Sequence, residues 1–288
     1  MLAQTLVDGI VLGALFALLG SGLTLVFGVM DVPNFAQAGV ITLAAYVMLW
    51  LQRGLGLTFW LAVLGGVLFA GVLSAATERL AYRFVRTRPL AAPVVALGLL
   101  LVLDNTALAI WGGDHVSLSP PYEGALLRFG GIHISGVALA LLLAAAVSLA
   151  AVQLFLHRTS VGRAIRAVSQ NSEAASLLGI SPQTQYMTAF FVSGLLAGVA
   201  AFAYAPTYAV FPYMADAVLL NAFVVVILGG LGNVWGAMLG GLLLGVVETL
   251  GAVYVSAAYQ TVFGFLLLLL MLVVRPSGLF GGGARRVA

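Results

Sequence analysis

The amino-acid sequence predicts an all-α polytopic membrane protein with about eight or nine transmembrane segments. Of its 288 residues, 62% are hydrophobic and 7% are charged, against about 25% charged in an ordinary soluble domain. A water-soluble fold could not bury this much apolar surface, and the long continuous apolar runs differ from the alternating pattern of a membrane β-barrel. We therefore expect residues 1–288 to form a single helical transmembrane domain.

The expected spans are apolar runs, which follow one another at 6–30, 36–51, 59–77, 90–111, 132–156, 184–205, 217–231, 234–256 and 261–274. Nine full crossings place the N-terminus outside, whereas eight place it inside if 36–51 does not fully cross. At about 1.5 Å per residue, the runs 217–230 and 261–274 reach only about 21 Å, against a hydrocarbon core of about 30 Å. We expect short helices there, and broken helices at 20–22, 31–39 and 229–236, where glycine or polar residues interrupt the pattern.

The charged residues predict the orientation. All twelve basic residues are arginine, and ten of them fall in three clusters: Arg79, Arg83, Arg86 and Arg88; Arg158, Arg163 and Arg166; and Arg275, Arg285 and Arg286. Segments rich in arginine stay in the cytoplasm. The loops assigned to the other side carry Asp114, Glu123 and Asp216 with Arg53 and Arg128. The net charge of +3 is therefore a topology signal, and we expect contact with membrane lipid and no binding of nucleic acid.

Missing residue types exclude several functions. Without lysine the chain has no Walker A motif, whose lysine holds the phosphates of ATP, so we expect no ATPase site in this chain. Without cysteine it has no disulfide, thiolate metal site or thiol nucleophile. The three histidines, His115, His133 and His157, are scattered in or near loops, so no metal site is expected. No grouping resembles a catalytic triad, and we do not expect an enzyme.

A polar stretch from His157 to Gln183 separates two long apolar runs and predicts two short surface helices. The first has an apolar face at the i, i+3, i+4, i+7 spacing, formed by Val161, Ala164, Ile165 and Val168, with Arg163 and Arg166 off that face. In the second, Ser172 suits the N-cap, Glu173 favours the positive end of the helix dipole, and Gly179 suits the C-terminal end before Pro182. Such a pair of helices is typical of a surface that contacts another protein.

Polar residues within apolar segments are candidates for a translocation path, because broken helices at membrane depth line cavities in transporters. A buried ionisable group costs roughly 2.5–3.5 kcal/mol on insertion scales. The candidates are Asn34, Phe35, Gln37, Asp104, Asn105, Asn221 and Glu248. Each of the polar ones can instead hydrogen-bond between helices, and that alternative stays open. The glycine pairs Gly194/Gly198, Gly236/Gly240 and Gly241/Gly245 predict close helix packing.

Part of the polar stretch, Glu173-Ala174-Ala175-x-x-x-Gly179, resembles the first half of the EAA motif of permease subunits in bacterial ABC importers. The second half, I-x-L-P, is absent, since its positions hold Ala189, Phe191 and Val192. Five stretches resemble the LivH-type branched-chain amino acid permease family in order along nearly the whole chain. They are residues 8–39, which contain N-F-A-x-x-G, then 78–99, 162–180, 226–250, which contain GGLGNVWG, and 273–281, which contain RPSGLFG.

This resemblance implies an ABC importer permease fold and a permease subunit of the bacterial inner (plasma) membrane that imports branched-chain or other apolar amino acids. The implied partners are two ATP-binding cassette subunits, which bind the ATP, a second, LivM-like permease subunit, and a periplasmic substrate-binding protein. No cofactor is implied for this chain. Residues 157–183 become the cytoplasmic coupling loop that docks on the ATPase, with coupling residues Arg163, Arg166, Glu173, Ala174, Ala175 and Gly179.

Two other functions remain open, the first from the residues and the second from the resemblance. One is an ion- or proton-coupled secondary transporter or channel that uses Asp104 and Glu248. The other is an ABC permease for urea or short amides. The energy source distinguishes a secondary transporter from an ABC permease. Gradient-driven transport needs only this chain, whereas an ABC permease needs its ATPase.

Overall fold

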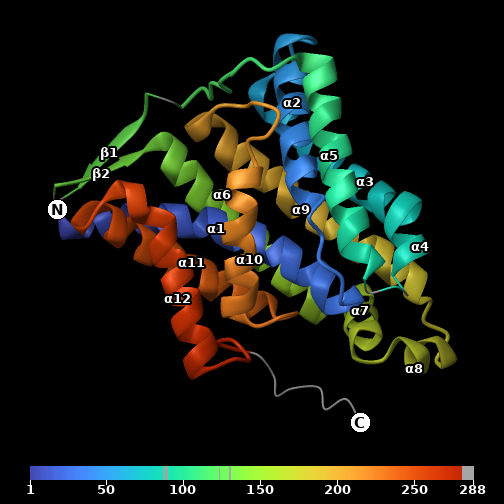
Figure 1. Cartoon of the computed structure of the whole chain (residues 1–288). Helices are drawn as coiled ribbons and strands as arrows, with labels where there is room; N and C mark the ends of the chain where they lie inside the picture. Colours follow the sequence, from blue (N-terminus) through green and yellow to red (C-terminus); the bar gives the residue numbers. More distant parts are fainter. Residues whose placement is uncertain (87, 89, 123, 130, 281–288) are drawn as a thin grey trace.

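The computed structural model describes residues 1–280 except 87, 89, 123 and 130, and the described chain is a helical bundle with one antiparallel hairpin (Figure 1). Glu123, Arg285 and Arg286, which enter the charge pattern above, lie outside the described residues.

Each expected apolar run contains a helix. In the first half of the chain the elements are α1 (Leu2–Met30), α2 (Gln37–Arg53), α3 (Phe59–Thr77), η1 (Glu78–Tyr82), α4 (Arg83–Val85), α5 (Ala91–Trp111), β1 (Leu126–Phe129) and β2 (Ile132–Ser135). In the second half they are α6 (Gly136–Arg158), α7 (Ser160–Gln170), α8 (Ser172–Leu177), α9 (Pro182–Tyr208), α10 (Asp216–Gly229), α11 (Val234–Tyr254), η2 (Ala257–Tyr259) and α12 (Gln260–Val274).

Seven helices within the described ranges are long and apolar enough to cross a membrane. They are Leu2–Met30, Phe59–Val85, Ala91–Trp111, Gly136–Arg158, Pro182–Tyr208, Val234–Tyr254 and Ala257–Val274. Two further helices are shorter, α2 with 17 residues and α10 with 14. The chain is thus a largely helical membrane protein, while the count of eight or nine crossings stays a prediction.

The hairpin was not predicted from the sequence. The run 132–156 was expected to be one helix, but Ile132–Ser135 pairs with Leu126–Phe129 as an antiparallel strand. The physical reason is local: Ile132, His133, Ile134 and Ser135 alternate apolar and polar residues, and Gly131 takes a positive φ of 84° at the turn. Helix α6 then begins at Gly136, because the Ser135 hydroxyl accepts a hydrogen bond from the Ala138 N–H at 3.1 Å.

Helix α1 lies at the centre of the bundle and packs against α6, α9, α10 and α11 (Figure 1). The expected break at residues 20–22 is wrong, because α1 is continuous from Leu2 to Met30. The two glycines there serve packing instead: a Cβ on Gly20 would overlap Val225 of α10, and a Cβ on Gly22 would overlap the Gln37 amide.

Close backbone contacts join the central helices, as the glycine pairs predicted. Gly245 of α11 lies against Gly13 of α1, and a Cβ on Gly241 would come within 2.5 Å of the Ala17 backbone nitrogen. Similarly, Gly194 of α9 lies against the backbone of Ala70 in α3. These contacts bring main chains together and increase the dispersion energy between helices, which matters where lipid removes the hydrophobic driving force.

The bundle has two distinct ends. At the hairpin end, Gln4 donates to the His133 carbonyl at 3.0 Å and accepts from the His133 N–H at 2.8 Å, so the start of α1 is tied to β2. An isolated bridge between Val116 and Val210 joins two connecting segments at the same end. At the opposite end, here called the α8 end, α7 and α8 lie beyond the last turn of α1 (Figure 1).

Candidate functional site: the α8 end

Helix α7 is held against the bundle by a tight corner. The Thr159 hydroxyl accepts a hydrogen bond from the Gly162 N–H at 2.9 Å and so caps α7. A side chain on Gly162 would overlap the backbone of Phe155 and Leu156, so α7 can fold back on α6 only with glycine there. The buried face is Gly162, Ile165 and Val168, whereas Val161, predicted to lie on it, is 40% exposed. The apolar face is therefore turned by about one residue from the predicted one.

Helix α8 is capped at both ends. Asn171, and not the expected Ser172, is the N-cap: its Oδ1 accepts from the N–H groups of Glu173 at 3.0 Å and Ala174 at 2.9 Å. The Asn171 backbone is extended, as an N-cap requires, and Ser172 is already helical. Gly179 closes the helix with a φ of 81°, and the Ile180 N–H bonds the Ala175 carbonyl at 3.1 Å.

The outer face of α8 is uncovered in the described chain and ends in two exposed leucines. Ala175 is buried against the bundle, and Glu173 and Ala174 are exposed. Leu177 and Leu178 are 85% and 80% exposed. We call Glu173, Ala174, Leu177 and Leu178 the α8 tip. The sequence reasoning missed the two leucines, although adjacent leucines in an otherwise polar stretch are a usable signal for a contact surface.

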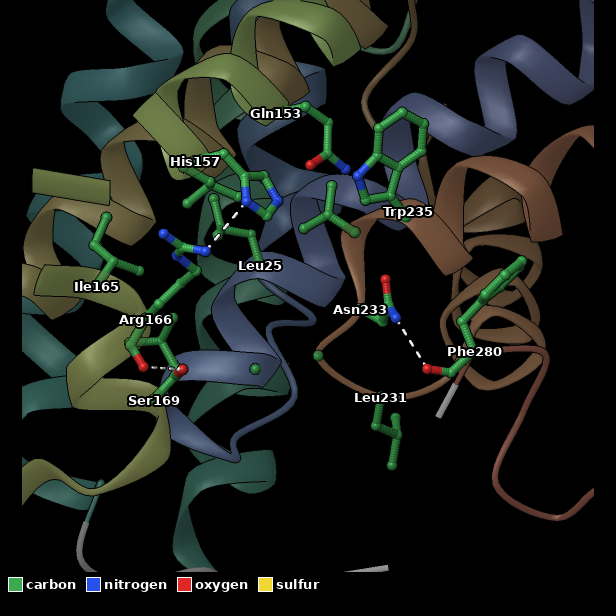
Figure 2. Close-up of a pocket in the computed structure, with 15 residues that line it drawn as sticks. Leu25, Gln153, His157, Ile165, Arg166, Ser169, Leu231, Asn233, Trp235 and Phe280 are labelled. Carbon is green, nitrogen blue, oxygen red and sulfur yellow. Dashed lines mark hydrogen bonds between the residues drawn. The ribbon is translucent and has the colours of Figure 1, made fainter. Parts of the chain in front are cut away.

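The two arginines assigned to coupling differ in their exposure on α7. Arg163 is exposed. Arg166 turns toward α6, where its Nη1 lies 3.1 Å from His157 Nδ1 (Figure 2). Of the two, Arg163 is thus the more exposed to solvent, while Arg166 contacts the end of α6.

Arg86 connects the segment after α8 with the end of α3. Its Nη2 donates to Gln183 Oε1 at 2.7 Å, and its guanidinium lies 5.1 Å from the ring centre of Tyr186. Its Nη1 is 3.9 Å from Glu78 Oε1, whose side chain is fully buried in η1. Gln183 and Tyr186 lie in the first two turns of α9, so Arg86 joins the start of α9, which follows α8 in the chain, to the end of α3.

Tyr82 continues this chain of contacts to the segment between α1 and α2. The Tyr82 hydroxyl donates to Asn34 Oδ1 at 2.8 Å, and its ring packs on Phe190 at a centroid distance of 4.9 Å. Both Glu78 and Tyr82 lie in η1, which is a π-helix of five residues. π-helical turns often occur at functional sites because the extra residue redirects side chains.

The polar residues of the predicted break are used between helices. Asn34 bonds Tyr82, and Phe35 stacks on Phe223 of α10 with ring centroids 4.7 Å apart. The Ser193 hydroxyl of α9 lies 2.9 Å from the Gly22 carbonyl and 3.1 Å from Gln37 Oε1. Gln37 also lines a small, mostly apolar cavity between α1, α2 and α10. Asn34 thus forms a hydrogen bond between helices. Gln37 contacts Ser193 of α9 and also lines the cavity.

The other predicted path residues are not gathered in one place. Asp104 of α5 and Glu248 of α11 are each 1% exposed, and Asn221 of α10 is 8% exposed. Helix α5 packs on α2, whereas α11 packs on α1, α10 and α12. Asn105 is exposed and donates to the Leu101 carbonyl of its own helix at 2.7 Å. Across the described residues, Asp104 and Glu248 therefore do not form a pair on one packed helix interface.

The chain's last described segment closes the α8 end. The N–H groups of Leu279 and Phe280 donate to the carbonyls of Leu228 and Gly229 at 2.8 and 3.2 Å. Asn233, the N-cap of α11, donates from Nδ2 to the Phe280 carbonyl at 2.9 Å (Figure 2). Sequence reasoning noted residues 226–250 and 273–281 as separate stretches, and the structure joins them by these hydrogen bonds.

Comparison with known proteins agrees with this architecture. The model of the family "Branched-chain amino acid transport system / permease component" matches residues 5–274. The chain is 32% identical to the high-affinity branched-chain amino acid transport system permease protein LivH of Escherichia coli, over 96% of this chain and 95% of that one. It is 31% identical to the corresponding protein BraD of Pseudomonas aeruginosa, with the same shares. It is 27% identical to LivM of Escherichia coli, over 97% of this chain and 71% of that one.

Among solved structures, a chain of PsaBC from Streptococcus pneumoniae, in complex with a Fab, has a similar fold. The TM-score is 0.53 and the sequence identity 12%, over 96% of this chain and 92% of that one. The identity to LivH over almost the full length of both chains, and the match across residues 5–274, show that this chain belongs to the family of branched-chain amino acid transport permease components.

Proposed function

We propose that this chain is the transmembrane permease subunit of an ABC importer for branched-chain or other apolar amino acids. It is a multi-pass protein of the inner membrane. The observation that carries the proposal is the 32% identity to a branched-chain amino acid permease over 96% of the chain. The α8 tip supports it, because a permease must offer a rigid exposed surface to its ATPase.

The orientation we propose has nine crossings, with the N-terminus outside and the α8 end in the cytoplasm. Helix α1 runs from the hairpin end to the α8 end, and the later long helices alternate in direction (Figure 1). Helix α2 returns to the hairpin end, where Arg53 donates to the Ser117 carbonyl at 2.7 Å. With 17 residues, α2 spans about 26 Å, close to the hydrocarbon thickness. The described arginines of the three clusters then all lie on the cytoplasmic side.

In this arrangement α8 is the coupling helix. Its capped ends resist fraying, so a push on Leu177 or Leu178 is transmitted and not absorbed. Arg86 and Tyr82 carry the displacement onward to Asn34, at the point where α2 begins. We propose that this route links nucleotide-driven motion of the ATPase to the segment between α1 and α2, and that Gln37 and the cavity beside it lie on the translocation path.

The proposed partners follow from the family. Two ATP-binding cassette subunits supply the energy, which this chain cannot supply through a Walker A motif because it contains no lysine. A LivM-like permease subunit completes the path, and a periplasmic binding protein delivers the amino acid at the hairpin end. The polar side chains that line the described cavities bind no cofactor in this scheme, since ATP is bound by the partners.

Reconstitution in proteoliposomes tests the energy source. We expect uptake of radiolabelled leucine with the LivM-like subunit, the ATPases, the binding protein and ATP, and no uptake by this chain alone under a proton or sodium gradient. Gradient-driven uptake by the chain alone would overturn the proposal in favour of a secondary transporter. The same liposomes loaded with a binding protein for urea or acetamide provide the control for substrate class, and we expect uptake of leucine to exceed uptake of the amide.

A further inference from the structure

A cavity of about 330 Å³ opens at the α8 end (Figure 2), and none of the four residues of the α8 tip lines it. Its walls come from the end of α1, from α6 and α7, and from the turn between α10 and α11. The volume falls in the range of small-ligand sites. No part of the route from α8 through Arg86 to Asn34 lines it, so the proposed coupling mechanism leaves it unused.

The charge of the cavity wall favours an anion. Arg166 and His157 contribute a guanidinium and an imidazole, held 3.1 Å apart. Arg166 Nε is buried and has no hydrogen-bond partner among the described residues. No aspartate or glutamate is among the described residues that line the cavity. A half-buried guanidinium with a free donor and no carboxylate beside it lacks the counter-charge that such groups ordinarily have.

Backbone geometry adds to the positive potential. The N-terminus of α11, a helix of 21 residues, lies in the cavity wall at Asn233, Val234 and Trp235. The N-terminal end of a helix carries a partial positive charge that attracts anions. The helix end and Arg166 approach the cavity from different elements, so two independent features favour the same ligand charge.

The residues at the rim of the cavity indicate which kind of molecule would bear the anionic group. Leu231, Trp235 and Phe280 line the cavity and are 57%, 52% and 47% exposed. Large exposed apolar side chains, one of them tryptophan, are typical of the membrane–water interface, where they meet acyl chains. Basic pockets between transmembrane helices on the cytoplasmic side are suited to acidic lipid headgroups.

We propose that this cavity binds the phosphate group of an anionic phospholipid from the cytoplasmic leaflet, with Arg166 and His157 as ligands and Trp235 and Leu231 against the acyl chains. The inference rests on the orientation proposed above, in which the α8 end is cytoplasmic. In this proposal Arg166 binds the lipid phosphate, and the exposed Arg163 remains the arginine of α7 that contacts the ATPase.

The test compares two arginines on the same helix. The purified permease–ATPase complex, as wild type, Arg166→Gln or Arg163→Gln, is incubated with equal amounts of phosphatidylglycerol and phosphatidylcholine, and bound lipid is measured by native mass spectrometry. Loss of one arginine contact should lower phosphatidylglycerol retention about five-fold in Arg166→Gln. Retention should be unchanged in Arg163→Gln, and Arg166→Lys should restore most of it, which separates the charge from a folding defect.

Other outcomes overturn the proposal. Equal loss in the two glutamine variants means a diffuse charge effect. Displacement of phosphatidylglycerol by inorganic phosphate at equal concentration means that the cavity holds a free phosphate ion. Unchanged lipid retention with loss of the ATPase subunits from Arg166→Gln means that Arg166 meets a carboxylate of the ATPase. ATP-driven uptake by the wild-type complex is measured in parallel, so failure of the transport function is seen separately.

Discussion

At the scale of single residues, the α8 end depends on a few positions whose chemistry cannot be exchanged. Gly179 takes a φ of 81° with no neighbouring heavy atom near its missing Cβ, so backbone conformation and not space requires glycine there. Asn171 satisfies two N–H groups of α8 with one carbonyl oxygen. Alanine at this position should cost about 1 kcal/mol of helix stability.

The prediction for Gly179 concerns coupling. A β-branched residue in left-handed conformation costs roughly 1–2 kcal/mol, so Gly179→Val should unwind the end of α8, leave membrane insertion intact and reduce uptake per ATP hydrolysed. The measurement is the ratio of leucine uptake to phosphate release in proteoliposomes. Gly98→Val is the matched control, because Gly98 also has open space around it but lacks the positive φ. Equal effects of the two substitutions would contradict a role for the α8 end.

The α8 tip supplies a second prediction. Leu177→Ser together with Leu178→Ser should weaken ATPase binding about a hundred-fold or more, because two exposed leucines that become buried on docking each contribute roughly 1.5–3 kcal/mol. Co-purification of the ATPase with the permease in detergent measures this. Leu143, which is 58% exposed on α6, gives a control serine substitution at a similarly exposed leucine far from α8. Retained ATPase binding in the double variant would place the docking surface elsewhere.

At the scale of elements, η1 connects the start of α9 to the start of α2. Tyr82→Phe should leave Asn34 Oδ1 buried without its donor and cost about 1–3 kcal/mol of stability. Combined with Arg86→Gln, it should lose less uptake than the product of the two single effects, because both residues act along one route. Leucine uptake of the two single variants and the double variant measures this. Independent, multiplicative losses would show that Arg86 and Tyr82 do not belong to one route.

Prediction from sequence succeeded for features that depend on a repeated residue pattern. It failed for features that depend on a single turn, cap or side-chain contact. Each of the predicted apolar runs contains a helix, and the glycine pairs predicted close helix packing. The hairpin was missed because four alternating residues lie at the edge of a longer apolar run. The N-cap was placed at Ser172, since Asn171 and Ser172 are both good caps and only backbone conformation distinguishes them. The inward turn of Arg166 depends on the position of His157, which periodicity does not give.

At the scale of the whole molecule, the proposed orientation is directly testable. The chain contains no cysteine, so one introduced cysteine is a unique label. Gln4→Cys at the hairpin end should react with a membrane-impermeant maleimide from the periplasm, and Ser176→Cys on α8 should react only after the inner membrane is opened. Ser176 is exposed and Gln4 is half-buried, so both positions are accessible to a maleimide. Labelling of Ser176→Cys in intact cells would reverse the orientation.

The backbone contacts between α1 and α11 also restrict how this subunit can move. Gly13 against Gly245 and Ala17 against Gly241 leave no side chain whose rotamer could change to let the two helices slide. We therefore expect α1 and α11 to move together as one rigid unit during transport. Conformational change should then concentrate in the short irregular segments, chiefly residues 31–36 and 230–233, which would serve as hinges next to this rigid pair of helices.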